Sequence, residues 1–509
     1  MKKVLTIMAA VVMVMGIAGC LQPGNLPRPA MAAQPAAKEY KDTIIVATFE
    51  DPTTMDPMEN NRSGIGVVTR QIFEGLWYQQ PDGTLVPQLA TDWKFEDDTT
   101  IRFNLRHNVT FHNGDPFTAN DVLFSFDRAS KDPISASTFQ AFDIPNCKVI
   151  DDYTFELKLK RPYAPIYNTL SIDRAQIADK AEVERVGDAA YARNPVGTGP
   201  YKFVKWAAGT DIYLTRYDGY WGDPALTPNI RFKVIPEAAS RVIELETGGA
   251  DMANMIQGSD VSRVNAIPGF HTEKGPSTRY VTVVFSMQNP VLADKNLRYA
   301  LSCAIDKQAL CDTVYGGAAT VADGMLPPTV FGYYSMGAIE YDAAKAKDML
   351  AQSGYKGETI DLLVDPVDEF TKIAEMIQNM WAAIGVKTNV VAMSVSAYQA
   401  QSGGHFQASV RAGTATEISN VLIIYDSKFG DRMEANDLKL DDMLAQGMTY
   451  YDNDRRFAFY KTIQEYLRDI RYTVPFAYTE TIYGISDKME GFVFDPNNEC
   501  MLKTVQVAK

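Results

Sequence analysis

Short stretches of the chain alternate apolar and polar residues, as half-buried β-strands do. Residues 43–49 (TIIVATF) and 99–105 (TTIRFNL) have this pattern, and 109–111 (VTF) is a shorter piece of the same kind. Residues 65–78 instead repeat apolar positions with helical spacing, ahead of the turn signal at 81–83 (PDG). The pattern therefore predicts a mixed α/β protein.

The stretch 111–122 (FHNGDPFTANDV) predicts a turn followed by a helix start. Asn113 and Gly114 both tolerate positive φ, and Thr118 stands three residues before Asp121, as in a capping box. A metal site is the alternative interpretation. The stretch lacks the Asp-x-Asp-x-Asp-Gly spacing of a calcium loop, and no second histidine lies at helical spacing from His112. We therefore predict a structural role.

The N-terminus has the pattern of an export signal. Lys2 and Lys3 precede an apolar run from Val4 to Ala18, and Ile17-Ala18-Gly19-Cys20 resembles the bacterial lipobox. Residues 1–19 are thus predicted to be a lipoprotein signal peptide, with Cys20 the lipidated first residue of the mature chain. An ordinary signal cut after residues 30–32 (AMA) is the alternative, and both interpretations predict an exported protein.

Residues 20–37 are predicted to be the lipidated cysteine and an extended, proline-rich tether, with folded structure beginning near Lys41. Loss of Lys2 and Lys3 with the signal changes the formal charge from −14 to −16. Such an acidic chain is a poor candidate for binding nucleic acid. Four further cysteines allow several disulfide pairings, and the sequence selects none of them (Cys147, Cys303, Cys311 and Cys500).

Motifs that define common enzyme classes are missing from the chain. Gly-x-Ser-x-Gly, Gly-x4-Gly-Lys-[Ser/Thr] and His-Glu-x-x-His do not occur. The adjacent carboxylates at 97–98 and 151–152 are expected in strand-connecting turns rather than as acid/base pairs. We predict that the protein is not an enzyme and uses no cofactor.

Five blocks carry a family resemblance, and they follow one another along nearly all of the mature chain. They are PQLATDWKFEDDTTIRFNLRHNVTFHNGDPFTANDVLFSFDR (87–128), NPVGTGPYKF (194–203), NLRYALSCAIDKQAL (296–310), YDAAKAKDMLAQSGY (341–355) and RRFAFYKTIQEYLRDIRYTVPFAY (455–478). Together they resemble the family 5 extracellular solute-binding proteins, the peptide and nickel receptors of ABC importers.

This resemblance implies an α/β fold of the two-lobed, type II periplasmic-binding-protein class, with a hinge and an extra domain inserted in the first lobe. The implied first lobe comprises 38–58, 190–278 and 480–509, the inserted domain 59–189, and the second lobe 279–479. The strand-like segments 276–286 and 472–485 are expected to cross between the lobes, which would close around a ligand by hinge motion.

The chemical class of the expected ligand is inferred from one segment of the chain. In peptide-binding relatives, a loop of the second lobe carries Gly-Trp and then an Asp-Pro whose aspartate pairs with the peptide's α-amino group. The matching segment here, 406–422 (FQASVRAGTATEISNVL), has neither. We hypothesise that Arg411, Glu417 and Asn420 line the cleft and that the ligand carries an acidic group, which suits a guanidinium. Alternatively, Arg411 and Glu417 pair with each other on an exposed loop.

The resemblance also implies weaker candidates for ligand contact. They are Thr48, Glu50, Asn60 and Arg62 in the first lobe, and Tyr280 in the first of the two strands expected to cross between the lobes. Nickel is another ligand class of the family, but His405 alone is weak support for a metal site. Gly197 and Gly199 are expected to serve a turn before a strand rather than to bind phosphate.

The leading functional hypothesis is a monomeric, exported, periplasmic or cell-surface lipoprotein that binds a peptide or peptide-like solute. Its expected partners are the ABC permease subunits of the cytoplasmic membrane and, through its N-terminal lipid, the membrane itself. The alternatives are a sensor or chaperone of the same fold that serves no permease, and a receptor for a nickel or metal chelate.

Overall fold

The computed structural model describes residues 38–59, 64–80, 84–394, 397–398, 406–414, 416–427 and 433–509. Residues 40–509 form one compact unit, and the fold below is that of this unit. The predicted signal peptide, Cys20 and the tether, together with Asn60, Arg62 and His405, lie outside the described residues. In the described part, no helix is long and apolar enough to span a bilayer.

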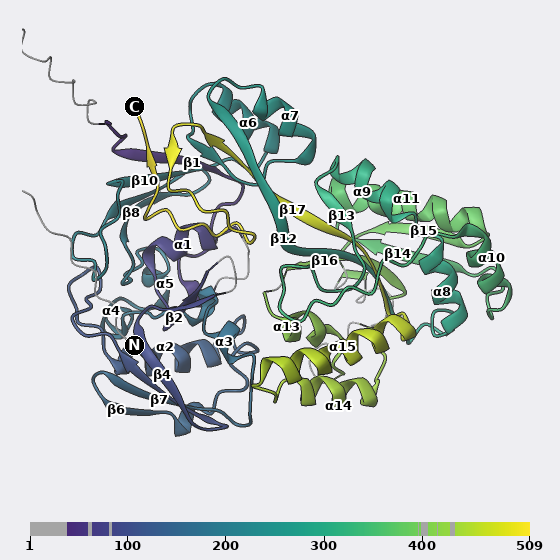
Figure 1. The fold of residues 1–509 in the computed structure, drawn as a ribbon, viewed down its shortest axis with the longest axis horizontal. Helices are drawn as coiled ribbons and strands as arrows, with labels where there is room; N and C mark the ends of the chain where they lie inside the picture. Colours follow the sequence, from purple (N-terminus) through teal and green to yellow (C-terminus); the bar gives the residue numbers. More distant parts are fainter. Residues whose placement is uncertain are drawn as a thin grey trace, which may run out of the picture. The chain divides into compact units, whose positions relative to one another are not determined.

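One large mixed sheet organises the unit, and Figure 1 shows its two long strands, β12 and β17, side by side. The order is β15-β14-β16-β12-β17-β11-β1-β10-β9-β8, and β13 also pairs with β17. The strands are β1 (Thr43–Thr48), β8 (Tyr201–Ala207), β9 (Asp211–Arg216), β10 (Asn229–Val234), β11 (Met252–Ala253), β12 (Phe270–Phe285), β13 (Ala319–Val321), β14 (Thr359–Val364), β15 (Lys387–Ala392), β16 (Ala408–Thr414) and β17 (Thr473–Ser486).

Strands β12 and β17 join two separately packed parts of the unit. The first half of β12 and the last half of β17 lie beside β11 and β1, whereas their other halves lie beside β16 and β13. The two strand-like segments predicted from the sequence are therefore confirmed as strands. β12 begins at Phe270, six residues before the predicted start, because pairing with Ser486 and its neighbours holds this more polar part in the sheet.

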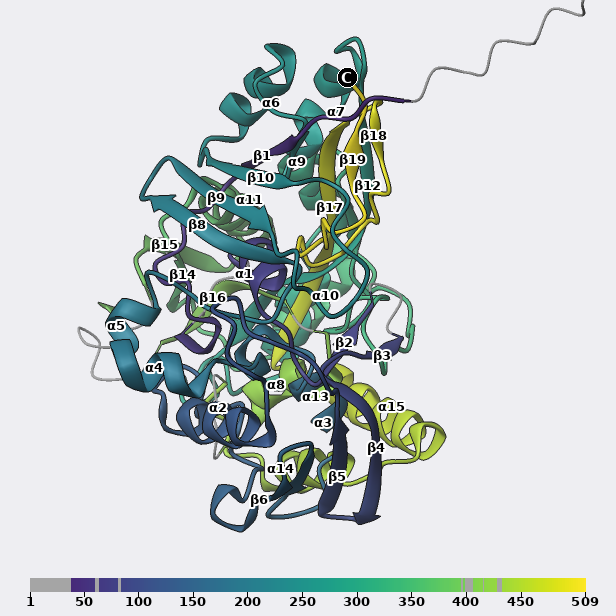
Figure 2. The ribbon, with the colours of Figure 1, turned by 90° about the vertical axis from the view of Figure 1, so that its left-hand side faces the viewer.

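We call the part around β1, β8–β11 and the smaller sheets the first lobe. Its smaller sheets have the orders β4-β5-β7-β6, β2-β3 and β18-β19, and Figure 2 shows β5 and β6 at the opposite end of the unit from α6 and α7. The strands are β2 (Trp77–Gln79), β3 (Leu85–Pro87), β4 (Ala90–Asp97), β5 (Thr100–Leu105), β6 (Lys148–Asp151), β7 (Thr154–Lys158), β18 (Met489–Glu490) and β19 (Gln506–Val507).

The helices of the first lobe pack against two cores. The larger core continues from β1 and β10 through α1 and α2 to the four-stranded sheet, and the smaller lies beneath α6 and α7. The helices are α1 (Gly66–Ile72), α2 (Ala119–Lys131), α3 (Ile166–Thr169), α4 (Lys180–Val186), α5 (Asp188–Tyr191), α6 (Ala238–Glu246) and α7 (Val261–Asn265), and the short 3-10 turn η3 spans Asp173–Ala175.

The part around β14–β16 is the second lobe, and it also has two cores. One core contains the fully buried Trp381 and packs α8, α9 and α11 on the sheet, and the other packs α13, α14 and α15. The helices are α8 (Lys295–Cys303), α9 (Lys307–Tyr315), α10 (Ala343–Ala351), α11 (Asp368–Ile384), α13 (Ile418–Leu422), α14 (Leu438–Gly447) and α15 (Asn453–Ile470).

The predicted turn and capping box are confirmed. Gly114 has φ +98°, and Thr118 is the N-cap of α2. The Asp121 carboxylate accepts from the Thr118 backbone N–H at 2.8 Å, and the Thr118 hydroxyl accepts from the N–H of Asn120 at 3.3 Å. Asp121 thereby satisfies a donor that the helix leaves without an intrahelical partner.

We expect Thr118→Ala to lower the free energy of unfolding by about 1 kcal/mol, because the hydroxyl partner of the first-turn N–H groups is lost. Urea unfolding of the purified chain measures the change. Thr53→Ala, the same substitution at an exposed position outside any helix, serves as the control and should change the value by less than about 0.5 kcal/mol. Equal effects of both variants would contradict a capping role.

Two sequence-based predictions of elements are wrong. The predicted helix 65–78 ends at Ile72, where Phe73 takes an extended conformation, and its last residues enter β2 instead. A short buried strand and a buried helical turn share one apolar pattern, so periodicity does not separate them. The predicted strand 109–111 forms only an isolated bridge from Thr110 to Pro116.

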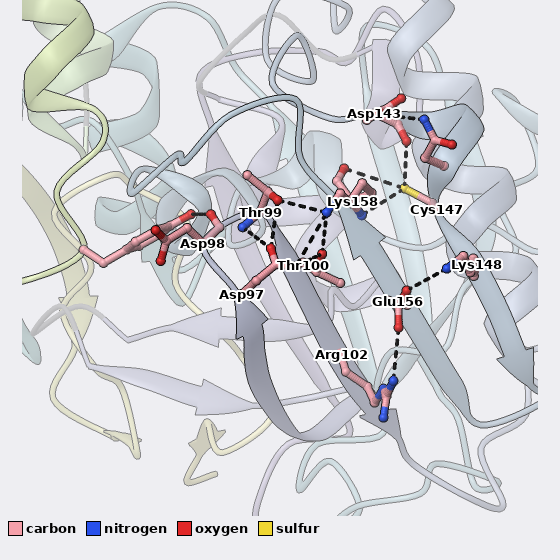
Figure 3. Close-up of polar contacts among 12 residues, drawn as sticks. Asp97, Asp98, Thr99, Thr100, Arg102, Asp143, Cys147, Lys148, Glu156 and Lys158 are labelled. Carbon is pink, nitrogen blue, oxygen red and sulfur yellow. Dashed lines mark hydrogen bonds and ion pairs between the residues drawn. The ribbon is translucent and has the colours of Figure 1, made fainter.

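The adjacent carboxylates at 97–98 and 151–152 lie at turns, as predicted. Figure 3 shows Asp97 bound by Thr99 and Thr100, with Lys158 close by. The Thr99 backbone N–H, its hydroxyl and the Thr100 hydroxyl all donate to Asp97 and lower its pKa to about 2. This carboxylate therefore fixes the turn between β4 and β5.

Candidate ligand-binding site

A cavity of about 360 Å³ lies where β12 and β17 pass from one lobe to the other. Its wall includes Arg70 and Asp173 from the first lobe and Thr414 and Asn420 from the second. The wall is rich in carboxamides, which are Gln79, Gln80, Asn168, Asn420, Asn497 and Asn498. These carboxamides can donate and accept hydrogen bonds to the polar groups of a ligand.

The lobes touch each other at the cavity. The Asn168 carboxamide, from the first lobe, donates to the Thr416 hydroxyl and accepts from Nδ2 of Asn420 at 3.1 Å. Asn420, predicted as a ligand contact, thus lies on the wall and also takes part in the contact between the lobes.

A second contact between the lobes lies away from the cavity. The Tyr451 hydroxyl donates to the Asp98 carbonyl at 2.9 Å and accepts from the Tyr163 N–H at 3.0 Å. The Ala164 N–H donates to the Met448 carbonyl at 2.7 Å. The lobes are therefore closed on each other in this structure.

Three acidic side chains and one arginine form a charged group on the first-lobe wall. Nε of Arg70 lies 3.0 Å from Asp173 and 2.7 Å from Glu499. Burial raises the pKa of Glu499 above its usual value; Arg70 opposes this shift, and the charges of Asp173 and Asp495 add to it. Two of the three acids, Asp173 and Glu499, contact the one arginine.

The other charged pairs on the wall are balanced. Arg279 contacts Glu369 at 2.7 Å, and the Tyr315 hydroxyl donates to the same carboxylate at 2.7 Å. Glu480 pairs with Lys274 at 2.8 Å. These charges already have partners without a ligand.

Asn498 has an unusual position on the wall. Its backbone is left-handed (φ +64°), its exposed fraction is 4%, and neither Oδ1 nor Nδ2 has a hydrogen-bond partner among the residues that the structure describes. Leaving a buried polar group unpaired costs about 1–3 kcal/mol. Both atoms have almost no accessible surface in this structure.

Two of the predicted second-lobe contacts lie elsewhere. Glu417 is buried and pairs with Arg456, and it caps α13 by accepting from the Ser419 N–H at 3.2 Å. The alternative prediction, that Glu417 pairs with Arg411 on an exposed loop, is therefore wrong. Glu417 is buried, and its carboxylate pairs with Arg456 of α15. Arg411 donates to the Ser409 hydroxyl at 3.0 Å and is not among the described cavity residues.

The remaining predicted contacts also lie off the described wall. Thr48 is fully buried and accepts from Nδ2 of Asn254 at 3.1 Å, and Tyr280 is 6% exposed in the second-lobe core. Glu50 is not one of the described wall residues, although its neighbour Phe49 is. The binding roles of these side chains stay predictions that the geometry does not support.

The wall residues of 495–499 (DPNNE) were missed. Their signal in the sequence is weak: two adjacent asparagines, a residue type that often adopts left-handed backbone. Arg70 was also missed, because its partners Asp173 and Glu499 are remote in sequence and only the folded chain brings them together.

His112 lies in a structural hydrogen bond, and the four described cysteines form no disulfide. His112 bonds to the Gly199 carbonyl at 2.9 Å, and burial lowers its pKa to about 4. All four cysteines are buried with free thiols (Cys147, Cys303, Cys311 and Cys500). The described part contains no cluster of three His, Cys, Asp or Glu side chains suited to a metal ion.

Comparison with known proteins identifies similar chains. Residues 84–430 match the model of the bacterial extracellular solute-binding proteins, family 5 Middle. The dipeptide-binding protein of Escherichia coli is 27% identical over 461 residues, covering 83% of this chain and 86% of that protein. Heme-binding protein A of Haemophilus influenzae is 26% identical and covers 97% of both chains.

Solved structures agree with this match. HbpA2 from Haemophilus parasuis has a TM-score of 0.81 at 25% identity, covering 92% of this chain and 100% of that one. DppA from Helicobacter pylori, in complex with the peptide STSA, has a TM-score of 0.77 at 25% identity and covers 92% and 98%.

The fold is thus the two-lobed type II periplasmic-binding-protein fold. The similar proteins are solute-binding proteins and not enzymes, in agreement with the sequence-based prediction. The match covers well over half of the chain, and the cavity lies between the two lobes. The chain belongs to the bacterial extracellular solute-binding proteins, family 5.

Proposed function

We propose that this protein captures a small, peptide-like solute in the cavity between its lobes and delivers it to the permease of an ABC importer. The observation that carries the proposal is a cavity of about 360 Å³ with walls from both lobes, lined by many charged and carboxamide side chains. Ligand pockets span about 300–1,000 Å³, so a small solute suits this cavity better than a long peptide.

The ligand is proposed to carry both charge signs or neutral amides rather than to be purely acidic. The hypothesis of an acidic ligand rested on Arg411, which is not a described wall residue. The wall instead combines Arg174 and Arg279 with Asp173, Asp495 and other carboxylates. Such a mixed wall complements a zwitterion, in which an ammonium and a carboxylate lie on one small molecule.

Hinge motion between the lobes is proposed to occur in the two crossing strands. The register of β12 on β17 shifts between Pro276 and Tyr280 and again between Val281 and Thr282, so the ladder is irregular in this region. This irregularity supports the predicted boundaries between the lobes at 278/279 and 479/480. We also propose that residues 59–189 form a domain inserted in the first lobe. The ligand would shift the protein from open to closed because it contacts both walls only when closed.

Export and membrane attachment form part of the proposal. Its basis is the family, the signal-like residues 1–19 and the lipobox cysteine Cys20. A multiply acylated Cys20 would hold the receptor at a membrane near the permease, because several acyl chains anchor firmly where one anchors marginally. We propose that the receptor acts as a monomer.

The first test identifies the cargo. The chain from residue 21 onward is purified without lipid and denatured, and any released small molecule is identified by mass spectrometry. A small peptide or peptide-like compound is expected. Recovery of no small molecule, together with no binding of amino acids or short peptides, would refute the proposal.

The second test compares Asn420→Ala with Arg411→Ala. We expect the first to raise the Kd of the identified cargo about tenfold, because a wall carboxamide is lost, and the second to change it less than about threefold. Isothermal titration calorimetry measures both. A larger loss with Arg411→Ala would favour the sequence-based choice of ligand contact.

A further inference from the structure

The contact between the lobes that lies away from the cavity joins backbone groups of the first lobe to the segment between α14 and α15 of the second. In this segment, the Tyr451 hydroxyl bridges the Asp98 carbonyl and the Tyr163 N–H, and the Met448 carbonyl accepts from the Ala164 N–H. None of these five residues is among the described residues of the cavity wall. The bonds join protein groups only, so a solute in the cavity takes no part in them.

Apolar packing accompanies these hydrogen bonds. Met448 and Tyr451 of the second lobe are partly buried and pack against the larger core of the first lobe. The Tyr451 ring meets the ring of Phe95, in β4, edge to face, with the ring centres 4.8 Å apart. Opening the lobes would break this packing and return apolar surface to water, which disfavours the open state.

Both sides of the contact are held in place by bonds of their own. On the first-lobe side, the Asp97 carboxylate fixes the turn between β4 and β5, and the buried Tyr163 has its hydroxyl 3.3 Å from that of Thr169. On the second-lobe side, Asp452 caps α15 by accepting from the Arg455 N–H at 2.8 Å. Surfaces that are already ordered lose little conformational entropy when they meet, so less of the contact energy is lost on closure.

We propose that Met448 and Tyr451 form a latch that holds the two lobes together in the empty protein. The latch favours the closed state before any solute arrives, and a bound solute adds its own contacts to this preference. Because the latch residues are not on the described cavity wall, the latch changes how strongly a solute is held without selecting its chemistry. The inference concerns the empty chain and does not depend on which solute is bound.

Spin-label distance measurements on the empty chain test the latch. The chain from residue 21 onward, carrying Lys94→Cys and Asp454→Cys, is unfolded, dialysed to remove any bound molecule, refolded and labelled. Both positions are exposed, one in β4 and one in α15, and the four described native cysteines are buried. With native Met448 and Tyr451, we expect most molecules to have the short distance of closed lobes.

Two substitutions of Tyr451 separate the hydroxyl from the ring. Tyr451→Phe removes the bridging hydroxyl and keeps the ring, and we expect it to lower the ratio of closed to open molecules about tenfold. Tyr451→Ala also removes the ring and should lower the ratio further. The matched control is Tyr450→Phe, because the Tyr450 hydroxyl accepts from Gln446 within the second lobe. This control should change the ratio less than about twofold.

Two outcomes would overturn the latch. One is an empty chain that is mainly open with Tyr451 in place. The other is an unchanged ratio in both Tyr451 variants, because other contacts would then hold the lobes together. Neither outcome bears on the proposed function, which the identification of the cargo decides.

Discussion

Glu417→Ala is expected to lower the free energy of unfolding by about 3–5 kcal/mol, because it leaves the buried Arg456 without its counter-charge. Both side chains are nearly inaccessible, at 5% exposure for Arg456 and 6% for Glu417. The Arg456 guanidinium donates to both carboxylate oxygens and lies 5.1 Å from the ring centre of Phe331. Because α13 and α15 meet at this pair, their packing should weaken together.

Urea unfolding followed by circular dichroism measures the loss. Asp127→Ala, which breaks the exposed Lys131–Asp127 pair, is the control and should cost less than about 0.5 kcal/mol. The double variant Glu417→Leu with Arg456→Met should recover much of the stability, since no unpaired charge remains. Normal stability with loss of cargo binding in Glu417→Ala would instead restore Glu417 as a ligand contact.

Gly197→Ala should destabilise the first lobe by about 3 kcal/mol, near the upper end of the usual cost of overpacking. Gly197 and Gly199 lie in the turn that leads into β8, as predicted. A Cβ added at Gly197 would lie 2.8 Å from the carbonyl carbon of Ile72, which is backbone at the end of α1, and closer still to its oxygen. The Gly199 N–H donates to this same oxygen at 2.8 Å, so the turn cannot move away without breaking that bond.

Thermal and urea unfolding provide the measurement. Gly324→Ala is a suitable control, because a Cβ there would meet its nearest atoms, of Met336 and Tyr478, at an ordinary 3.8 Å. It should change stability by less than about 1 kcal/mol. An unaffected Gly197→Ala variant would show that the turn before β8 has room to move away from Ile72, contrary to the close approach inferred here.

Features governed by neighbours in sequence were predictable from the sequence. The capping box of Thr118 and Asp121 and the turns at 97–98 and 151–152 depend on hydrogen bonds across two or three residues. The strands β1, β5 and β17 followed from their apolar patterns. The prediction of one helix over 65–78 failed, because the segment divides into α1 and β2, and a short buried helix and a short buried strand have the same apolar pattern.

The sequence alone thus determined the secondary structure of the long segments and, through five family-like blocks, the two-lobed solute-binding class. Only the tertiary structure decided which side chains face the cavity. Arg70, Asp173 and Glu499 meet there from distant parts of the chain, and Glu417 turned instead to Arg456. Such pairing depends on how whole elements pack, which local periodicity does not encode, and for this reason Asn498 emerged only from the folded chain.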